Sequence, residues 1–347
     1  MIAAGGRQQA LPMLKPQGRR TDPALLPKRR GIARDDSIMR NMGRWIRERL
    51  ETALVMSLRA FAKGVPPLWA SRTGAAIGWV LFAVFRFRRK IVEHNLNVAF
   101  GATMSKAELH DIAERCYRHF GAMFMEFLGG FPGVRTAPPA LDMRPLEDAF
   151  AQGKGVVGFT AHFGSWVLGG ATIAAAGYPT TIFGGRMANP AVDALHMEAL
   201  KALHIGVLHK TDSPRTLVKT LRAGRVMGIA ADLHESTKRY FVRFFGQPVS
   251  VSPGPYRLAK LSGAPTVYSS CVRVDDLRYK LTIRAVPMPE PSGNDELDLL
   301  KYAQSCFSLL EADVRAHPEQ YLWMHHRFRT IHLEEYLSPD NRAFLGE

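Results

Sequence analysis

Cysteine is scarce in this 347-residue sequence, and its three cysteines stand at positions that exclude two kinds of cross-link. Cys116, Cys271 and Cys306 are far apart and show no paired spacing, so we expect neither a disulfide framework nor a zinc site. A reducing compartment is the default environment for such a chain. The sequence also has no G-x-G-x-x-G segment, no P-loop and no internal repeat, and we expect no metal and no cofactor.

Apolar segments of membrane-spanning length are missing as well. The charge-poor stretch at 74–87 is shorter than the roughly 20 apolar residues that cross a bilayer, and no later stretch is longer and as apolar. It ends in a basic cluster that suits anionic headgroups. The cluster consists of Arg86, Arg88, Arg89 and Lys90. We interpret 74–87 as a monotopic membrane anchor, and a buried helix is the alternative.

Acidic residues are outnumbered, with 31 Asp and Glu against 46 Lys and Arg, which gives a formal net charge of +15. Such a charge requires an anionic partner or surface, and the candidates are an anionic lipid leaflet, phosphorylated substrates or nucleic acid. Nucleic acid is disfavoured because the positive residues cluster beside apolar anchors rather than beside repeated aromatic residues. We therefore expect an anionic membrane surface as a partner, and no nucleic acid.

The first hundred residues divide into two expected regions. Residues 1–42 predict a disordered basic tail, because they are rich in arginine, proline and glycine and lack an apolar period. They also lack the apolar core and cleavage site of a signal peptide. Residues 43–100 are expected to form a membrane-associating helical region. Within it, 43–62 alternates apolar residues with arginines at helical spacing, which is typical of an interfacial helix; a helix packed on the core is the alternative.

Residues 101–335 are expected to form one α/β domain, with a single mixed β-sheet flanked by helices. Ser105 and Glu108 form a capping-box pattern that opens a helix at 106–128. Farther along, short β-branched runs alternate with helical patterns, which indicates a sheet with crossover helices. The expected strands are 155–160, 179–183, 205–208, 226–231, 265–273 and 278–286. The expected helices are 166–177, 190–204, 213–223, 253–262 and 296–316.

The segment His162-Phe163-Gly164-Ser165-Trp166 is the most informative motif of the sequence. It follows the expected strand 155–160 and precedes a helix of small residues, so His162 stands at the carboxyl end of a strand. Open α/β sheets bind their ligands at that edge. A neutral imidazole placed there can take a proton from a hydroxyl or amine nucleophile.

Four motifs in order resemble the lysophospholipid and lipid A acyltransferase superfamily, and most closely its late lauroyl/myristoyl acyltransferases of lipid A assembly. They are Thr160–Trp166, Gly184–Pro190, Phe241–Val249 and His317–Phe328. The resemblance covers roughly residues 43–330. It implies a glycerolphosphate-acyltransferase-like fold and an acyltransferase of the cytoplasmic face of a bacterial inner membrane.

The resemblance also implies roles for individual residues. His162 is the expected general base, which deprotonates a hydroxyl or amine of a lipid acceptor such as a lipid A precursor or a lysolipid. The acceptor then attacks the acyl thioester of an acyl carrier protein (acyl-ACP) or of coenzyme A (acyl-CoA). The candidate substrate-binding residues are Arg186, Asn189, Asp232, Glu126 and Arg327. A capping turn with a solvated arginine is the alternative at 184–190.

One position departs from the family pattern. The family has Asp or Glu five residues after the histidine, whereas this chain has Val167. Another carboxylate can replace it, and the candidates are Asp232, Glu235 and Glu126. The alternatives are a degenerate relative that binds lipid or carrier protein without turnover, and a substitution introduced deliberately at 167.

Overall fold

The computed structural model describes residues 33–131, 135–136, 142–234, 240–329 and 335–346. The chain divides into two compact units, Met1–Arg47 and Glu48–Glu347. The elements are, in order, α1 (Ala33–Gly64), α2 (Pro67–Ala83), α3 (Arg89–Phe100), α4 (Lys106–Leu128), β1 (Arg135–Thr136), α5 (Arg144–Phe150), β2 (Val156–Thr160), α6 (Trp166–Ala175), β3 (Thr180–Gly184), α7 (Pro190–Ala202), β4 (Gly206–His209), α8 (Pro214–Arg222), β5 (Val226–Ala230), β6 (Phe241–Phe244), β7 (Gln247–Ser250), α9 (Gly254–Ser262), β8 (Thr266–Asp275), β9 (Arg278–Val286), α10 (Asp295–Ala316), a 3₁₀ turn (Pro318–Gln320) and α11 (Pro339–Leu345).

The first helix begins before the position expected from the sequence. Helix α1 starts at Ala33 rather than at 43, so the end of the expected tail is helical. Residues 33–42 contain neither proline nor glycine, so no residue there breaks the helix. Residues 1–32 lie outside the described part of the chain. Among the described helices, none combines the length and apolarity that crossing a membrane would require.

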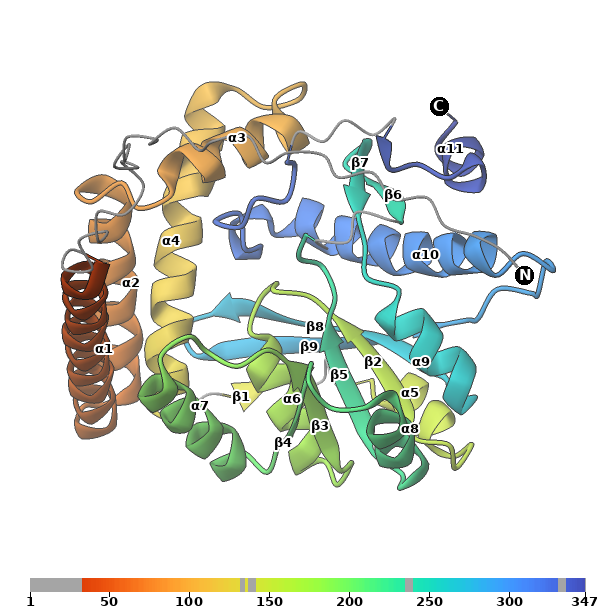
Figure 1. Cartoon of the computed structure of the whole chain (residues 1–347), viewed down its shortest axis with the longest axis horizontal. Coiled ribbons are helices and arrows are strands. Elements are labelled where there is room, and N and C mark those ends of the chain that lie inside the picture. The colour runs from red at the N-terminus through yellow and green to blue at the C-terminus, as the bar shows by residue number, and fades with distance from the viewer. Residues whose placement is uncertain (1–32, 132–134, 137–141, 235–239, 330–334, 347) are drawn as a thin grey trace, which may run out of the picture. The chain divides into compact units, whose positions relative to one another are not determined.

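Within the described residues, seven strands form the main sheet in the order β1-β9-β8-β2-β5-β3-β4 (Figure 1). Strands β2, β5, β3, β4 and β8 are parallel, whereas β9 runs antiparallel to β8, so the sheet is mixed as expected. The six strands expected from the sequence are all present, and their ends differ by at most two residues from the expected positions.

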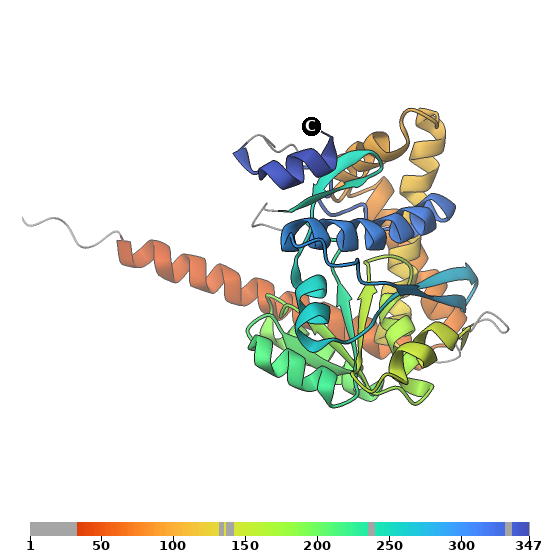
Figure 2. The same ribbon diagram turned by 90° about the vertical axis from the view of Figure 1, so that its right-hand side faces the viewer.

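A second, two-stranded sheet was not expected from the sequence. Strands β6 and β7 form an antiparallel hairpin of their own, in addition to the single mixed sheet that the sequence predicts. Phe245 and Gly246 connect them, both with positive φ (52° and 72°), as in the tight turns that favour hairpins. Helix α10 lies between this hairpin and the main sheet in both views (Figures 1 and 2).

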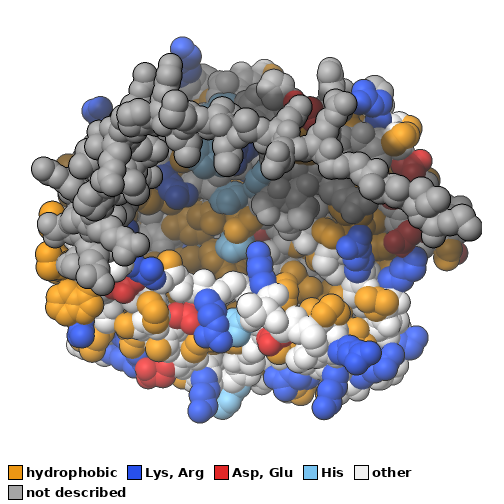
Figure 3. Space-filling view, viewed as in Figure 1, with side chains coloured by type: hydrophobic (Ala, Val, Ile, Leu, Met, Phe, Trp, Pro, Cys, Tyr) orange, Lys and Arg blue, Asp and Glu red, His pale blue; other side chains and the backbone are white. Residues whose placement is uncertain are grey.

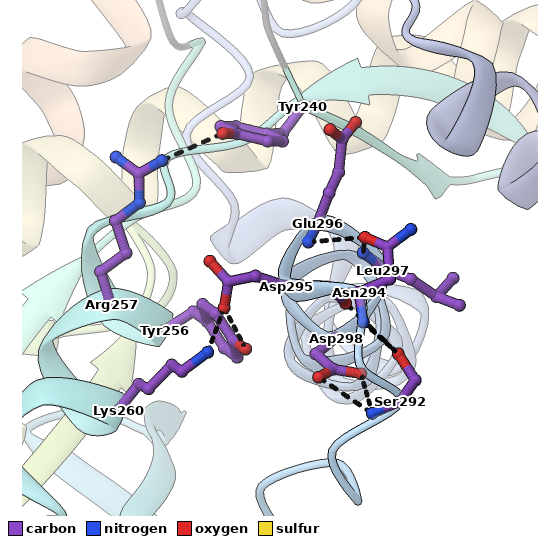
Figure 4. Close-up of polar contacts among 10 residues, drawn as sticks. All are labelled: Tyr240, Tyr256, Arg257, Lys260, Ser292, Asn294, Asp295, Glu296, Leu297 and Asp298. Atoms are coloured by element: carbon purple, nitrogen blue, oxygen red, sulfur yellow. Dashed lines mark hydrogen bonds and ion pairs between the residues drawn. The ribbon is translucent and has the colours of Figure 1, made fainter.

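The amino end of α10 is fixed by polar contacts that also tie it to α9 (Figure 4). The Asn294 side-chain oxygen accepts hydrogen bonds from the backbone N–H groups of Glu296 (3.0 Å) and Leu297 (3.2 Å), as an N-cap residue does. Asp295 pairs with Lys260 and accepts a hydrogen bond from the Tyr256 hydroxyl (2.9 Å). The carboxylate on α10 therefore neutralises a cation on α9.

Strand β2 is buried on both faces, which explains its continuous apolar sequence. Val157 and Phe159 belong to a core that also contains side chains of α4, α8, α9 and α10. Val156 points to the opposite face, into a core with Leu168 and Ile173 of α6 and side chains of α5. The strand that leads to His162 is therefore held by apolar packing on both sides.

Helices α2 and α4 lie side by side (Figure 1) and approach closely at glycines. A Cβ atom at Gly78 would lie 2.0 Å from the carbonyl oxygen of Tyr117, and one at Gly74 would lie 2.2 Å from that of Gly121. A Cβ atom at Gly121 would likewise lie 2.1 Å from the carbonyl oxygen of Gly74. Glycines four residues apart on α2 thus let the two backbones touch, and any side chain there would separate them.

Replacing Gly78 by alanine is expected to lower the free energy of unfolding by roughly 1–3 kcal/mol, because the added methyl group overpacks the α2–α4 contact. Urea denaturation followed by circular dichroism measures the change. Gly64→Ala is the matched control, since a Cβ atom there meets open space, and we expect it to be neutral or slightly stabilising. A Gly78→Ala variant as stable as the wild type would contradict this packing.

Candidate active site

The segment from His162 to Trp166 is a sharp connection between β2 and α6. Gly164 has a φ of +59°, and a Cβ atom at this position would lie 2.1 Å from the carbonyl oxygen of Cys271. Only glycine fits a left-handed conformation with so close a backbone contact. The glycine of the motif is therefore required by the turn itself.

Backbone hydrogen bonds hold this connection from two other elements. The N–H of Gly164 donates to the carbonyl of Gln320 (2.9 Å), and the N–H of Leu322 donates to the carbonyl of His162 (3.0 Å). Ser165 donates its N–H to the carbonyl of Cys271 on β8 (2.7 Å). The backbone on both sides of His162 is thus fixed, which limits where its imidazole can lie.

Helix α4 supports the same turn through a buried histidine. His119 is 7% exposed, and its Nε2 lies 3.4 Å from the carbonyl oxygen of Gly164. Burial, together with the charge of Arg273, lowers the pKa of His119 to about 3. The ring is therefore neutral, and Nε2 carries the proton because a carbonyl oxygen can only accept.

Asp232 is the carboxylate that reaches His162. Strands β2 and β5 pair in parallel with Thr160 opposite Ala230, so the residues two positions beyond each strand end stand side by side. Asp232 Oδ1 lies 2.8 Å from His162 Nδ1 and accepts a second hydrogen bond from the backbone N–H of His162 (3.0 Å). The Asp232 side chain is fully buried, whereas that of His162 is 22% exposed.

This pair fixes the tautomer of His162. An ionised carboxylate can only accept hydrogen bonds, so Nδ1 carries the proton and Nε2 has a free lone pair when the ring is neutral. The ring also contacts Trp166 edge to face, with 4.9 Å between the centroids. The arrangement is that of a general base oriented by an acid.

Electrostatics around the pair favour its charged form. Burial alone would lower the pKa of His162, but the charge of Asp232 and its hydrogen bond outweigh burial, and the pKa is raised. Burial alone would raise the pKa of Asp232, but the charge and hydrogen bonds of His162, with a contribution from the charge of Arg327, lower it. Asp232 thus remains ionised and stabilises an imidazolium beside it.

Arg327 lies beneath the pair rather than on the surface. Its side chain is 2% exposed, and Nη1 donates to the carbonyl of Ser250 (3.0 Å). Its guanidinium also lies 5.0 Å from the ring centroid of Phe307. This burial places Arg327 as a fixed positive charge near Asp232, out of reach of a bulky substrate.

His325 belongs to the motif His317–Phe328, but the sequence analysis did not single it out as a site residue. Its Nε2 accepts a hydrogen bond from the backbone N–H of His234 (3.1 Å). Burial, followed by the charge of Arg327, lowers its pKa to about 4, so the ring is neutral. No group of three or more His, Cys, Asp or Glu within the described residues is placed to hold a metal ion.

The structure does not bring Glu126 to His162. Its buried carboxylate is bound by Ser71 of α2 (2.6 Å), by Arg273 of β8 (2.8 Å) and by the hydroxyl of Tyr279 on β9. Glu126 therefore joins two helices to the sheet, a role that its sequence position on an amphipathic helix did not reveal. Glu235, the other candidate carboxylate, lies outside the described residues.

The turn after β3 holds the two remaining candidates, which differ in their surroundings. Asn189 caps α7, with its side-chain oxygen accepting from the N–H of Ala191 (3.1 Å), and its amide donates to the carbonyl of Glu48 on α1 (2.9 Å). Arg186 is 66% exposed, with a guanidinium nitrogen 3.5 Å from Asp193. Asn189 is thus engaged in structure, whereas Arg186 remains accessible to an anion.

Val167 is half-buried on α6 and packs against apolar clusters that include Leu168 and Leu200. The Nδ1 position of His162 that a carboxylate would occupy is already taken by Asp232. The chain therefore has an acid–histidine pair without an acid at 167.

One face of the molecule is hollowed (Figure 3). Histidine and apolar side chains gather at the centre of this hollow, so polar groups suited to proton transfer lie beside surface suited to an aliphatic chain.

The raised pKa of His162 can be measured directly. By NMR titration, the His162 ring of the wild type is expected to stay protonated to a higher pH than an ordinary histidine. In Asp232→Asn the carboxylate charge is lost and burial remains, so the midpoint is expected to fall below the ordinary value. His162→Gln assigns the signal and Arg186→Gln is the matched control. An unchanged midpoint in Asp232→Asn would refute the pairing.

Comparison with known proteins identifies the family of the chain. Residues 39–330 match the family model of the bacterial lipid A biosynthesis acyltransferases. The chain is 26% identical over 266 residues to a lipid A biosynthesis lauroyltransferase of Escherichia coli (strain K12), a match that covers 75% of this chain and 85% of the relative. It is 27% identical over 284 residues to a lipid A biosynthesis palmitoleoyltransferase of the same strain, covering 78% and 90%.

A lipid A biosynthesis acyltransferase of Shigella flexneri matches equally well, with 27% identity over 284 residues. The family match spans well over half of the chain and contains both members of the His162–Asp232 pair. The resemblance expected from the four motifs is thereby confirmed, and this chain belongs to the bacterial lipid A biosynthesis acyltransferase family.

Proposed function

We propose that this acyltransferase moves a fatty acyl group from an acyl thioester to a hydroxyl group of a lipid A precursor, with His162 as the general base. The observation that carries the proposal is the 2.8 Å contact between His162 Nδ1 and the buried carboxylate of Asp232. The names of the relatives, which are lipid A lauroyl- and palmitoleoyltransferases, support the substrate class.

The proposed reaction uses one proton transfer in each direction. Nε2 of His162 takes the proton of the acceptor hydroxyl while the oxygen attacks the carbonyl carbon of the thioester. The tetrahedral adduct then expels the thiolate, and the imidazolium returns the proton to sulfur. An oxygen ester forms and the carbon–sulfur bond breaks. Asp232 stabilises the imidazolium between the two steps.

The proposal also assigns a residue that binds the charged part of a substrate and the molecule that donates the acyl group. Arg186, exposed at the carboxyl end of β3, binds an anionic group of a substrate, because a guanidinium can grip phosphate or carboxylate with two hydrogen bonds. The donor is the acyl thioester of an acyl carrier protein, and coenzyme A is the other thiol compatible with the same chemistry.

We further propose that the chain works at the cytoplasmic face of a bacterial inner membrane, held there by an anionic leaflet. The segment after α2 exposes apolar side chains beside cations: Val84 is 63% exposed, Phe85 70% and Phe87 51%. Arg86, Arg88 and Lys90 are exposed between and after them. Aromatic side chains flanked by cations favour the headgroup region of an anionic bilayer.

Val167 is the observation that favours a second candidate, a degenerate relative that binds lipid or carrier protein without turnover. The two candidates differ in one measurable respect: only the enzyme forms an acylated lipid. The geometry favours the enzyme, since the pair that orients the base is complete without an acid at 167.

Mass spectrometry of lipid products tests the function. Purified chain, a lauroyl thioester of acyl carrier protein and a lipid A precursor are expected to give a product heavier by one acyl group. His162→Ala is expected to abolish the product, and Asp232→Asn to lower turnover by about four orders of magnitude, as loss of an orienting carboxylate does in a serine protease. His326→Ala, an exposed histidine exchanged outside the pair, is the control and is expected to be active.

Folded wild-type chain that binds the lipid but yields no acylated product would favour the binding protein. Equal turnover by the wild type and His162→Ala would exclude His162 as the base.

Liposome flotation tests the membrane surface. Phe85→Ser/Phe87→Ser is expected to lower binding to phosphatidylglycerol vesicles at least tenfold, because burying a phenylalanine is worth roughly 1.5–3 kcal/mol and about 1.4 kcal/mol is a factor of ten. Leu261→Ser is the control, an exposed apolar residue on α9. If Leu261→Ser weakens binding as much as the double variant does, the segment after α2 is not the anchor.

A further inference from the structure

Helix α8 has one side made of positive charges. Arg215, Lys219 and Arg222 are all exposed, and their spacing of four and then three residues places them on the same side of the helix. Figure 3 shows Lys and Arg side chains gathered over α8. The opposite side of the helix is apolar, with Leu221 buried in the core. We call these three residues the α8 basic stripe.

The stripe has no acidic counterpart within the described structure. Residues 213–231 contain neither Asp nor Glu, and no described side chain forms an ion pair with any of the three cations. The neighbouring helix α9 differs, because its Lys260 is paired with Asp295 of α10 (Figure 4). Like charges four residues apart repel each other, so the stripe is a cost to the isolated fold that an anionic partner would relieve.

The stripe begins at the rim of the active site. Helix α8 follows β4, whose carboxyl end lies at the same edge of the parallel strands as His162. The backbone N–H of Lys210, between β4 and α8, donates to the carbonyl of Gly184 (3.2 Å), two residues before Arg186. From there the nine residues of α8 extend about 14 Å away from that edge.

The surroundings of the stripe distinguish it from a membrane contact. Large apolar side chains are exposed after α2, at Phe85 and Phe87, but none of α8 is among the exposed large apolar residues. Leu217 and Val218 are half-buried against the core. A surface with cations and no apolar anchor suits a soluble acidic macromolecule better than a bilayer, which gains affinity from buried apolar area.

We propose that the α8 basic stripe docks the acidic surface of the carrier protein that delivers the acyl thioester, which rests on the thioester chemistry of the proposed function. Three cations spread along a helix match carboxylates spread along a protein surface, whereas the clustered phosphates of coenzyme A require a compact site. Docking at the rim lets the thioester arm of the carrier reach His162 while the protein stays outside.

Charge reversal with three donors tests this surface. The variant Arg215→Glu/Lys219→Glu/Arg222→Glu is expected to lower kcat/KM for a lauroyl thioester of acyl carrier protein at least roughly tenfold, because steering by charge accounts for factors of 10 to 1,000 in association. Lauroyl-pantetheine carries neither a charge nor a protein that could dock. The α8 variant is therefore expected to use this donor at the wild-type rate. Lauroyl-coenzyme A is the third donor and is expected to be affected little.

The matched control is Lys106→Glu/Lys280→Glu/Lys301→Glu. It reverses the same number of exposed positive charges as the α8 variant, on α4, β9 and α10, and is expected to resemble the wild type. An equal loss with coenzyme A would indicate a phosphate site, and an equal loss with pantetheine would indicate damage to the active site. Weaker binding of the α8 variant to phosphatidylglycerol vesicles would indicate a membrane contact. Each of these results overturns the proposal.

Fluorescence anisotropy of labelled carrier protein measures docking without acyl transfer, so it tests the docking surface independently of the proposed function. The wild type is expected to bind the carrier, and the α8 variant to bind it at least tenfold more weakly than the control variant does. Equal binding by the two variants overturns the docking surface even if acyl transfer is confirmed. Absence of acyl products from all three donors contradicts the proposed function, while the anisotropy result still decides the docking surface.

Discussion

The buried contact between Asp232 and His162 is the interaction on which the site depends. A carboxylate without solvent is costly unless a charge or several hydrogen bonds compensate it, and both come from His162 and its own backbone N–H. The parallel register of β2 and β5 makes this contact possible, since it brings the residues after the two strands together. The sheet therefore determines which acid serves the histidine.

The rest of the motif serves the same contact. Gly164 permits the turn, and the carbonyls of Gln320 and Cys271 hold it, so the backbone of His162 is kept beside Asp232. Arg327 adds a positive charge below the pair at a position sealed from solvent. In this chain the acid is provided by a neighbouring strand, which frees position 167 to be an apolar packing residue.

The positions of the main-sheet strands could be predicted from the sequence, whereas the side-chain contacts of the candidate site could not. Buried parallel strands such as 155–160 are short β-branched runs, and their ends were predicted within two residues. The hairpin at Phe241–Ser250 was missed because its aromatic residues and Gly246 also fit a turn before a helix. The sequence could not show that Asp232, rather than Glu126 or Glu235, pairs with His162. That pairing depends on the register of β2 and β5 and on the three side chains that donate hydrogen bonds to the Glu126 carboxylate.

The glycine contact between α2 and α4 has a mechanical consequence. The backbones of the two helices are in contact at Gly74, Gly78 and Gly121, so the helices form one closely packed body. One end of this body leads into the exposed segment at 84–90, and its middle touches the turn of His162 through His119. In the proposed membrane-bound state, the depth of that segment among the lipid headgroups would set the distance of the His162 imidazole from the bilayer.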